Sequence, residues 1–128
     1  NNLGDIVDYV PDWQFVSINA NRDWIATHRE LAVRFLRAVL RGTDWMYTHR
    51  AEAARIAARE LPSPLHHAER AWDYFTGTGA LPRDMSINLK GLAAVVAKLK
   101  ESGLLAQDAT DDLAFYIDDA CLREARGG

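Results

Sequence analysis

The sequence contains a single cysteine, Cys121, among its 128 residues. One cysteine can form no internal disulfide and cannot build a cysteine-based metal cluster. We expect Cys121, which lies among apolar and charged residues, to be a small core residue rather than a reactive thiol. The sequence is therefore neither a disulfide scaffold nor a cysteine-rich metal domain.

Long apolar runs are also missing, because no stretch approaches the roughly 18 apolar residues of a membrane span. The first residue is Asn1, and neither a basic nor an apolar signal-peptide region follows it. We interpret the sequence as a processed chain or a fragment. Its first residues then do not indicate where the parent protein is located.

An excess of positive charge is absent, since the formal net charge is -3. The arginines are spread through predicted helices and interleave with Asp and Glu, which is typical of solvated helix faces. Nucleic-acid-binding domains carry a basic patch or stripe. We therefore expect no nucleic acid partner.

Catalytic and metal-binding motifs are missing as well. His66 and His67 are adjacent on a predicted helix, so they point about 100° apart and cannot share one metal. His28 and His49 lack a convincing second ligand at helical spacing, and no Gly-x-Ser-x-Gly nucleophile motif is found. We therefore predict no catalytic residues, no metal, no cofactor and no enzymatic activity.

The stretch from Trp13 to Asn19 has the alternating pattern of a short β-strand. Phe15 and Ser17 would point to one side of the strand, and Gln14, Val16 and Ile18 to the other. No hairpin turn follows, and a lone strand leaves its backbone donors and acceptors unpaired. It pairs with strands outside this chain, or with a second copy, or it is not a strand. We favour the first.

The remaining sequence predicts a mainly α protein with about five to six helices. Residues 1–22 form a connector and the crossing strand, and residues 23–128 form the helical part. Thr27 and Glu30 fit a capping box at the first helix, and Gly42 fits its end. No internal repeat is identified. Further helices are predicted over 51–61, with an apolar stripe from Ala53 to Leu61, and over 63–77, 88–103 and 110–123.

Four tryptophans contribute most of the aromatic surface. Trp45 and Trp72 fit the core faces of their helices, which is the usual role of large aromatic residues. The other two flank Asn19-Ala20-Asn21, where the predicted strand becomes a helix. Amides and aromatic rings at such a junction can line a cleft. The predicted ligand-binding residues are Trp13, Asn19, Asn21 and Trp24.

The order of these features resembles a known family. A strand ending in a small polar turn and an aromatic residue is followed by a helix with a Phe, a Trp-containing turn and a Glu-Ala-x-x-Ile helix. The matching segments are Phe15–Trp24, Val33–Ala38, Trp45 and Glu52–Ile56, then Trp72, Ile87-Asn88, Gly103 and Asp111-Asp112-Leu113. This order resembles the late region of nitrate/sulfonate/taurine-type solute-binding proteins of ABC importers, which include thiamine-pyrimidine-precursor-binding relatives.

The resemblance implies that the chain is the C-terminal segment of an α/β two-lobed fold of the periplasmic-binding-protein type II class. It implies a small organic or anionic solute as ligand, an ABC permease as partner of the parent protein, and a periplasmic or otherwise extracytoplasmic location. Two alternatives remain: a pyrimidine-precursor synthase of the same fold, and a free-standing helical interaction or oligomerisation module. The isolated chain is also expected to self-associate.

Overall fold

The computed structural model describes residues 8–127, which form two compact units. The first unit comprises the described residues up to Arg22 together with Ile87–Asp119. The second comprises Asp23–Ser86 together with the described residues from Ala120 onward. Within the described residues there are five α-helices and one short 3-10 helix, and no strand. The mainly helical prediction is confirmed.

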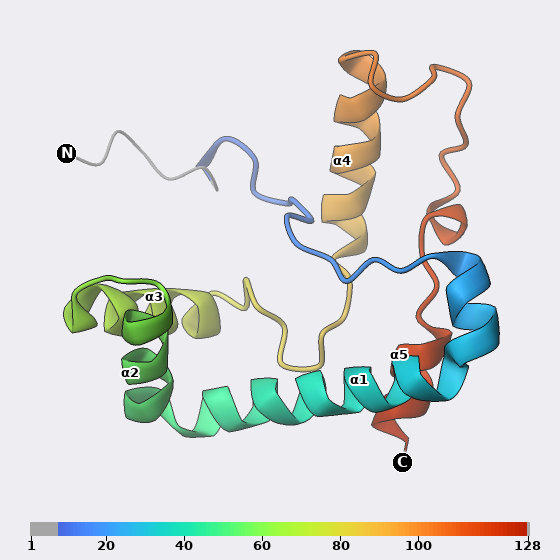
Figure 1. Cartoon of the computed structure of the whole chain (residues 1–128). Coiled ribbons are helices and arrows are strands. Elements are labelled where there is room, and N and C mark those ends of the chain that lie inside the picture. The colour runs from blue at the N-terminus through green and yellow to red at the C-terminus, as the bar shows by residue number, and fades with distance from the viewer. Residues whose placement is uncertain (1–7, 128) are drawn as a thin grey trace. The chain divides into compact units, whose positions relative to one another are not determined.

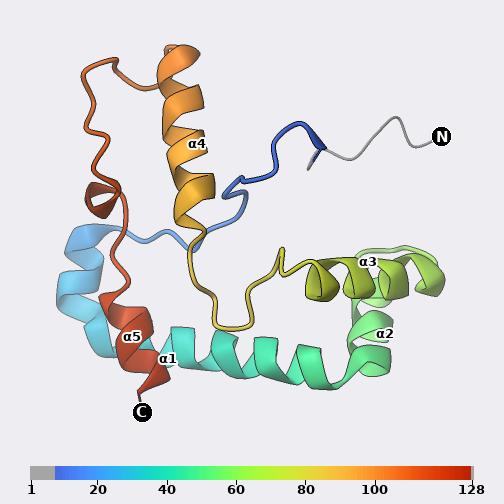
Figure 2. The ribbon, with the colours of Figure 1, turned by 180° about the vertical axis from the view of Figure 1, so that it is seen from behind.

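In the second unit, helix α1 (Arg22–Thr48) carries the short helix α5 (Ala120–Arg126) on one side (Figures 1 and 2). Side chains of both helices are buried together at this contact. The buried cluster contains Cys121, as the sequence predicted. Its members are Ala32, Val33, Cys121 and Ala125, with Ile25, Leu36 and Leu40 packed against it.

Helices α2 (Arg50–Glu60) and α3 (Leu65–Gly77) pack against each other in the same unit. Ala54 and Ala68 are buried in their helices, and residues this small permit a close approach. The predicted stripe of α2 is confirmed only in part: Ala53 and Ala57 are half-buried, whereas Ile56 and Leu61 are exposed and Ala54 is buried instead.

Trp72 and Arg50 connect α3 to the preceding helices. The indole N–H of Trp72 donates to the Met46 carbonyl oxygen at 3.0 Å, and the Arg50 guanidinium lies 5.7 Å from the centre of its ring. Arg50 also donates two hydrogen bonds to Asp73, at 2.7 and 2.6 Å. The bidentate pair lowers the pKa of Asp73 and raises that of Arg50, mainly through these hydrogen bonds.

A seven-residue pattern, Asp-Trp-x-x-Thr-His-Arg, occurs twice in the second unit, at 23–29 and 44–50. The first copy contains a kink in α1 at His28, where φ is -129° and ψ is 31°. The second ends α1 at Thr48, and His49 adopts a similar non-helical conformation with φ -127° and ψ 59°. We name these two segments the Trp-His brackets. They are an internal repeat that the sequence analysis missed.

The same interactions between histidine, threonine and tryptophan occur within each bracket. His28 Nδ1 lies 2.8 Å from Thr27 Oγ1 and 3.1 Å from the Trp24 carbonyl oxygen, and the His28 ring stacks on the Trp24 ring at 5.0 Å. A carbonyl oxygen can only accept, so Nδ1 carries the proton. In the second bracket the corresponding bonds of His49 are both 2.9 Å, and its ring stacks on Trp45 at 4.8 Å.

These brackets explain three wrong predictions. Thr27 does not cap a helix, because its hydroxyl donates backward to the carbonyl oxygens of Asp23 and Trp24. Trp45 does not lie in the core, because its ring stacks on His49 and stays 38% exposed. Gly42 does not end the first helix, which continues to Thr48. The helix ends in the second bracket, where the side chains of Thr48 and His49 form hydrogen bonds with the Trp45 carbonyl oxygen.

In the first unit, helix α4 (Leu89–Glu101) is capped by Asn88, whose side-chain oxygen accepts from the Gly91 N–H at 3.0 Å. The 3-10 helix η2 (Leu113–Phe115) packs against α4. Lys100 of α4 forms an ion pair with Asp111 at 2.8 Å, and only 13% of the lysine side chain is exposed. This pair connects the end of α4 to the segment that precedes η2.

The predicted strand from Trp13 to Asn19 is not a strand in this structure. It is an irregular segment that touches the first turn of α4, where Gln14 Oε1 accepts from the Asn88 N–H at 2.9 Å. Phe15 is 86% exposed. Without a neighbouring strand no ladder can form, so local side chains satisfy part of its backbone, as when Gln14 Nε2 donates to the Val16 carbonyl at 2.6 Å.

Gly91 is the point where this segment and α4 come closest. A Cβ atom there would lie 2.6 Å from the Gln14 nitrogen and 2.7 Å from the Trp13 carbonyl carbon, both backbone atoms. We expect Gly91→Ala to destabilise the protein by about 1–3 kcal/mol, because the backbone must move. Gly42→Ala is the control, with open space around it in α1, and should stabilise by about 0.5–1 kcal/mol. Urea denaturation compares both, and equal stabilisation would contradict the close contact.

The brackets generate a second prediction. His49→Ala removes the Nδ1 bonds and the stacked ring, and we expect a loss of about 1 kcal/mol in the free energy of unfolding. His66→Ala is the matched control, since His66 is an exposed α3 histidine whose ring contact is with neighbouring His67. Thermal denaturation followed by circular dichroism measures both variants. A loss in His49→Ala no larger than in His66→Ala would show that the bracket does not contribute to stability.

Candidate functional site

The four predicted ligand-binding residues are divided between the two units. Trp13, Asn19 and Asn21 belong to the first unit, and Trp24 belongs to the second. Asn19 is exposed and hydrogen-bonds with Ser17, whose hydroxyl lies 3.3 Å from Asn19 Oδ1. Trp24 is 41% exposed and stacked on His28. Aromatic faces and amides are thus accessible in both units, and the residues stay predicted ligand contacts.

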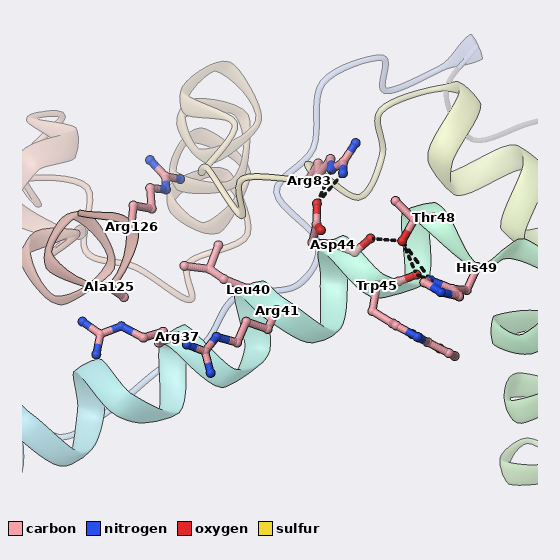
Figure 3. A pocket seen from close by; sticks show the side chains of 10 residues that line it. All are labelled: Arg37, Leu40, Arg41, Asp44, Trp45, Thr48, His49, Arg83, Ala125 and Arg126. Atoms are coloured by element: carbon pink, nitrogen blue, oxygen red, sulfur yellow. Dashed lines mark hydrogen bonds and ion pairs between the residues drawn. The ribbon is translucent and has the colours of Figure 1, made fainter. Parts of the chain in front are cut away.

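The second unit contains an open groove of about 510 Å³ along the C-terminal half of α1. Figure 3 shows its lining, to which the loop after α3 and the end of α5 also contribute. Arginines predominate among its charged groups. We call this surface the α1 groove, and it is lined by Arg37, Leu40, Arg41, Asp44, Trp45, Thr48, His49, Arg83, Ala125 and Arg126.

Arg83 connects the loop after α3 to α1 inside this groove. Its Nε donates to Asp44 Oδ1 at 2.8 Å, and its guanidinium lies 5.5 Å from the centre of the Tyr47 ring (Figure 3). The Tyr47 hydroxyl donates to the carbonyl oxygen of Leu81 in the same loop. Asp44 therefore neutralises Arg83, and the pair positions the loop more than it attracts a ligand.

Arg126 is held by the same loop from the side of α5. Its Nε donates to the Asp84 carbonyl oxygen at 3.1 Å, and its guanidinium lies 3.5 Å from the Asp84 carboxylate. The Ser86 backbone N–H donates to that carboxylate at 3.0 Å. This bond is the main reason that the pKa of Asp84 is below its ordinary value of 3.8, and the charge of Arg126 lowers it further.

A second hollow of about 230 Å³ adjoins the groove on α1 and is lined by Arg34, Arg37, Ala38 and Arg41. We call it the arginine hollow. None of its three arginines forms an ion pair with any residue from 8 to 127. The Nε atom of Arg37 is buried and has no hydrogen-bond partner. The sequence analysis treated these arginines as a solvated face, although their i, i+3, i+7 spacing places them on one stripe.

Two other kinds of site were searched for over residues 8–127. No group of three or more His, Cys, Asp and Glu side chains there could hold a metal ion. No helix in this part of the chain is long and apolar enough to cross a membrane. The candidate features of the described residues are the predicted ligand contacts, taken in each unit separately, and the arginines of α1.

Comparison with known proteins gives one match. Residues 4–53 match the family described as "NMT1/THI5 like", the family of NMT1/THI5 and nitrate/sulfonate-type binding proteins. This segment is similar to that family, and it contains all four predicted ligand-binding residues and both brackets. The resemblance predicted from the sequence is confirmed over this segment. Searches of curated proteins and of solved structures gave no match.

The lowered pKa of Asp84 predicts an effect of pH on stability. Its carboxylate adds stability that is complete above the ordinary pKa of 3.8 and is lost as pH falls through the lower folded-state value. Asp84→Asn should therefore destabilise the protein at neutral pH, with a difference from the wild type that shrinks below pH 3.8. Urea midpoints at a series of pH values measure it.

The control for this experiment is Asp108→Asn, which changes an exposed carboxylate that has no ion pair in the described part of the chain. Its midpoints should follow those of the wild type over the whole pH range. A difference between Asp84→Asn and wild type that stays constant down to the most acidic point would contradict the role given to Asp84.

Proposed function

We propose that this chain is part of an extracytoplasmic solute-binding protein that delivers a small organic or anionic solute to an ABC permease. The observation that carries the proposal is the family match over residues 4–53. That family includes nitrate/sulfonate-type binding proteins. The matched segment contains the irregular stretch and the kinked start of α1, so the proposed binding region and the family segment coincide.

The exposed apolar side chains of the segment from 15 to 18 support the view that further strands complete the fold. Phe15, Val16 and Ile18 are all exposed. In a two-lobed binding protein such a segment would pair with strands that cross between the lobes. We propose that this segment is the crossing strand of the parent protein, and that it becomes ordered as a strand only there.

The proposed ligand contacts are Trp13, Asn19, Asn21 and Trp24. Indole rings provide flat apolar surface, and side-chain amides provide both hydrogen-bond donors and acceptors. A small solute with an apolar part and a polar group would use both kinds of contact. The permease would then recognise the conformation in which the two lobes have closed around the solute.

The alternative within the family is an enzyme, since the family includes THI5-type enzymes as well as binding proteins. By the resemblance, a pyrimidine-precursor synthase would need a cysteine-rich segment linked to iron and an active-site histidine. Cys121 is the one cysteine of the sequence and it is buried against α1. This chain would contribute little to such chemistry, so binding is the function we propose.

Calorimetry on the full-length protein that carries this chain tests the proposal. The ligand panel contains nitrate, taurine with other alkyl sulfonates, and the pyrimidine precursor of thiamine. We expect one class to bind, and Trp24→Ala to weaken its binding roughly tenfold, about 1.4 kcal/mol. If no compound of the panel or of a wider thermal-shift screen bound, the proposed function would be wrong.

Trp45→Ala is the matched control for Trp24→Ala. Both tryptophans stack on a histidine in a bracket, with exposures of 41% and 38%, so both variants lose the same local contact. Only Trp24 lies in the predicted binding region. Equal weakening by the two variants would mean that stability rather than ligand contact is lost, and would contradict the proposed contact.

The remaining alternative, a free-standing helical module, is tested by light scattering. A chain that lacks partner strands should self-associate through exposed residues such as Phe15, whereas an independent module should be a monomer or a symmetric dimer. Concentration-independent monomer behaviour of the isolated chain would favour the module.

A further inference from the structure

The arginine hollow lies wholly on one helix. Arg34, Arg37 and Arg41 are separated by three and then four residues, and on a helix such residues are neighbours on one face. Ala38 lies within the same lining and leaves the space between the longer side chains open. The hollow therefore presents three guanidinium groups around a small side chain.

This arrangement is electrostatically unfavourable as it stands. Like charges three and four residues apart destabilise a helix by about 0.2–0.5 kcal/mol per pair, and no carboxylate among the described residues forms an ion pair with any of the three. Elsewhere in the second unit the arginines Arg29, Arg50, Arg83 and Arg126 all have carboxylate partners. The hollow therefore gathers on one helix face three arginines that are unpaired among residues 8–127, whereas Arg70 of the same unit stands alone on α3.

A second observation concerns Arg37 itself. Its Nε is buried and lacks a hydrogen-bond partner, and a buried donor without a partner costs free energy. In Figure 3 the side chains of Arg37 and Arg41 both point toward the N-terminal end of α1, and that of Arg41 extends toward Arg37. Both guanidinium groups thus extend in the same direction along α1, within the lining of one hollow.

We propose that the arginine hollow binds a small oxyanion, namely a phosphate, sulfate or sulfonate group. Arginine is always charged, and its planar fork donates paired hydrogen bonds to such oxygens. The hollow has a volume of about 230 Å³ and is open to solvent, so an anion could enter it while keeping part of its hydration shell. The proposal rests on the positions of the three arginines along α1. It does not depend on the solute-binding function proposed above.

Titration with inorganic phosphate and sodium sulfate at low millimolar concentration, followed by calorimetry and by the unfolding temperature, tests the site. We expect saturable binding by the wild type, and a roughly tenfold or greater loss of affinity in Arg37→Gln and in Arg41→Gln. Arg37→Lys retains the charge without the fork and should recover only part of the affinity.

Arg70→Gln is the control, because Arg70 is an exposed helical arginine on α3 that also lacks an ion pair among the described residues. Its phosphate affinity should equal that of the wild type. Sodium chloride at matched ionic strength should give no saturable effect. An equal loss of phosphate affinity in Arg37→Gln, Arg41→Gln and Arg70→Gln would mean that the effect is general charge screening. Equal stabilisation by chloride and by phosphate would mean the same, and either result would overturn the proposal.

A lipid headgroup offers the same phosphate chemistry, so a last arm uses vesicles. Vesicles with and without anionic phospholipid are compared by co-sedimentation in the presence of competing inorganic phosphate. Binding of free phosphate by the wild type, dependent on Arg37 and Arg41, supports the proposed site whether or not vesicles also bind. Binding to anionic vesicles without any binding of free phosphate would overturn it. Circular dichroism confirms that each variant is folded.

Discussion

The contact between α1 and α5 is the interaction on which the second unit depends. Ala32 and Val33 of one helix and Cys121 and Ala125 of the other form its buried cluster. Residues some ninety positions apart in the sequence, such as Arg29 and Glu124, thereby form an ion pair at 2.9 Å. The contact also brings Ala125 and Arg126 to the edge of the α1 groove.

The brackets determine where the helices of this unit bend and end. In each of them a histidine bonds to a carbonyl oxygen one turn earlier and stacks on a tryptophan, so that the backbone leaves helical geometry at the histidine. The first bracket kinks α1 at His28, and the second separates α1 from α2 and places Arg50 beside Trp72 and Asp73. A local hydrogen-bonding pattern thus decides the paths of three helices.

The proposed functions use different chemistry on different parts of the chain. The segment from Trp13 to Trp24 offers amides and aromatic rings within the family match, which suits a small solute held between lobes. The arginine hollow offers concentrated positive charge on a regular helix, with one buried donor unpaired. The first depends on strands that complete a sheet, whereas the second needs only the face of α1.

Parts of the fold could be predicted because local chemistry determines them. Asn88 is followed by an apolar-periodic run, and it caps α4. Gly77 ends α3 and Cys121 is buried. The failures at Thr27 and Gly42 have a common cause, since a threonine or glycine favours a helix boundary only when no stronger local bond competes. The repeated Asp-Trp-x-x-Thr-His-Arg pattern was visible in the sequence, but its effect depends on the stacked geometry.

By itself, then, the sequence determined that the chain is mainly helical, where three of its helices lie, and which family its first part resembles. Periodicity, caps and the order of motifs are properties of neighbouring residues, so they can be read without coordinates. Only the tertiary structure decided that Trp13–Asn19 lies against α4 rather than forming a strand. It alone also decided that three arginines have no carboxylate partner among residues 8–127. Both outcomes depend on which residues far apart in the sequence come into contact in the folded chain. The spacing of residues along the sequence does not specify those contacts.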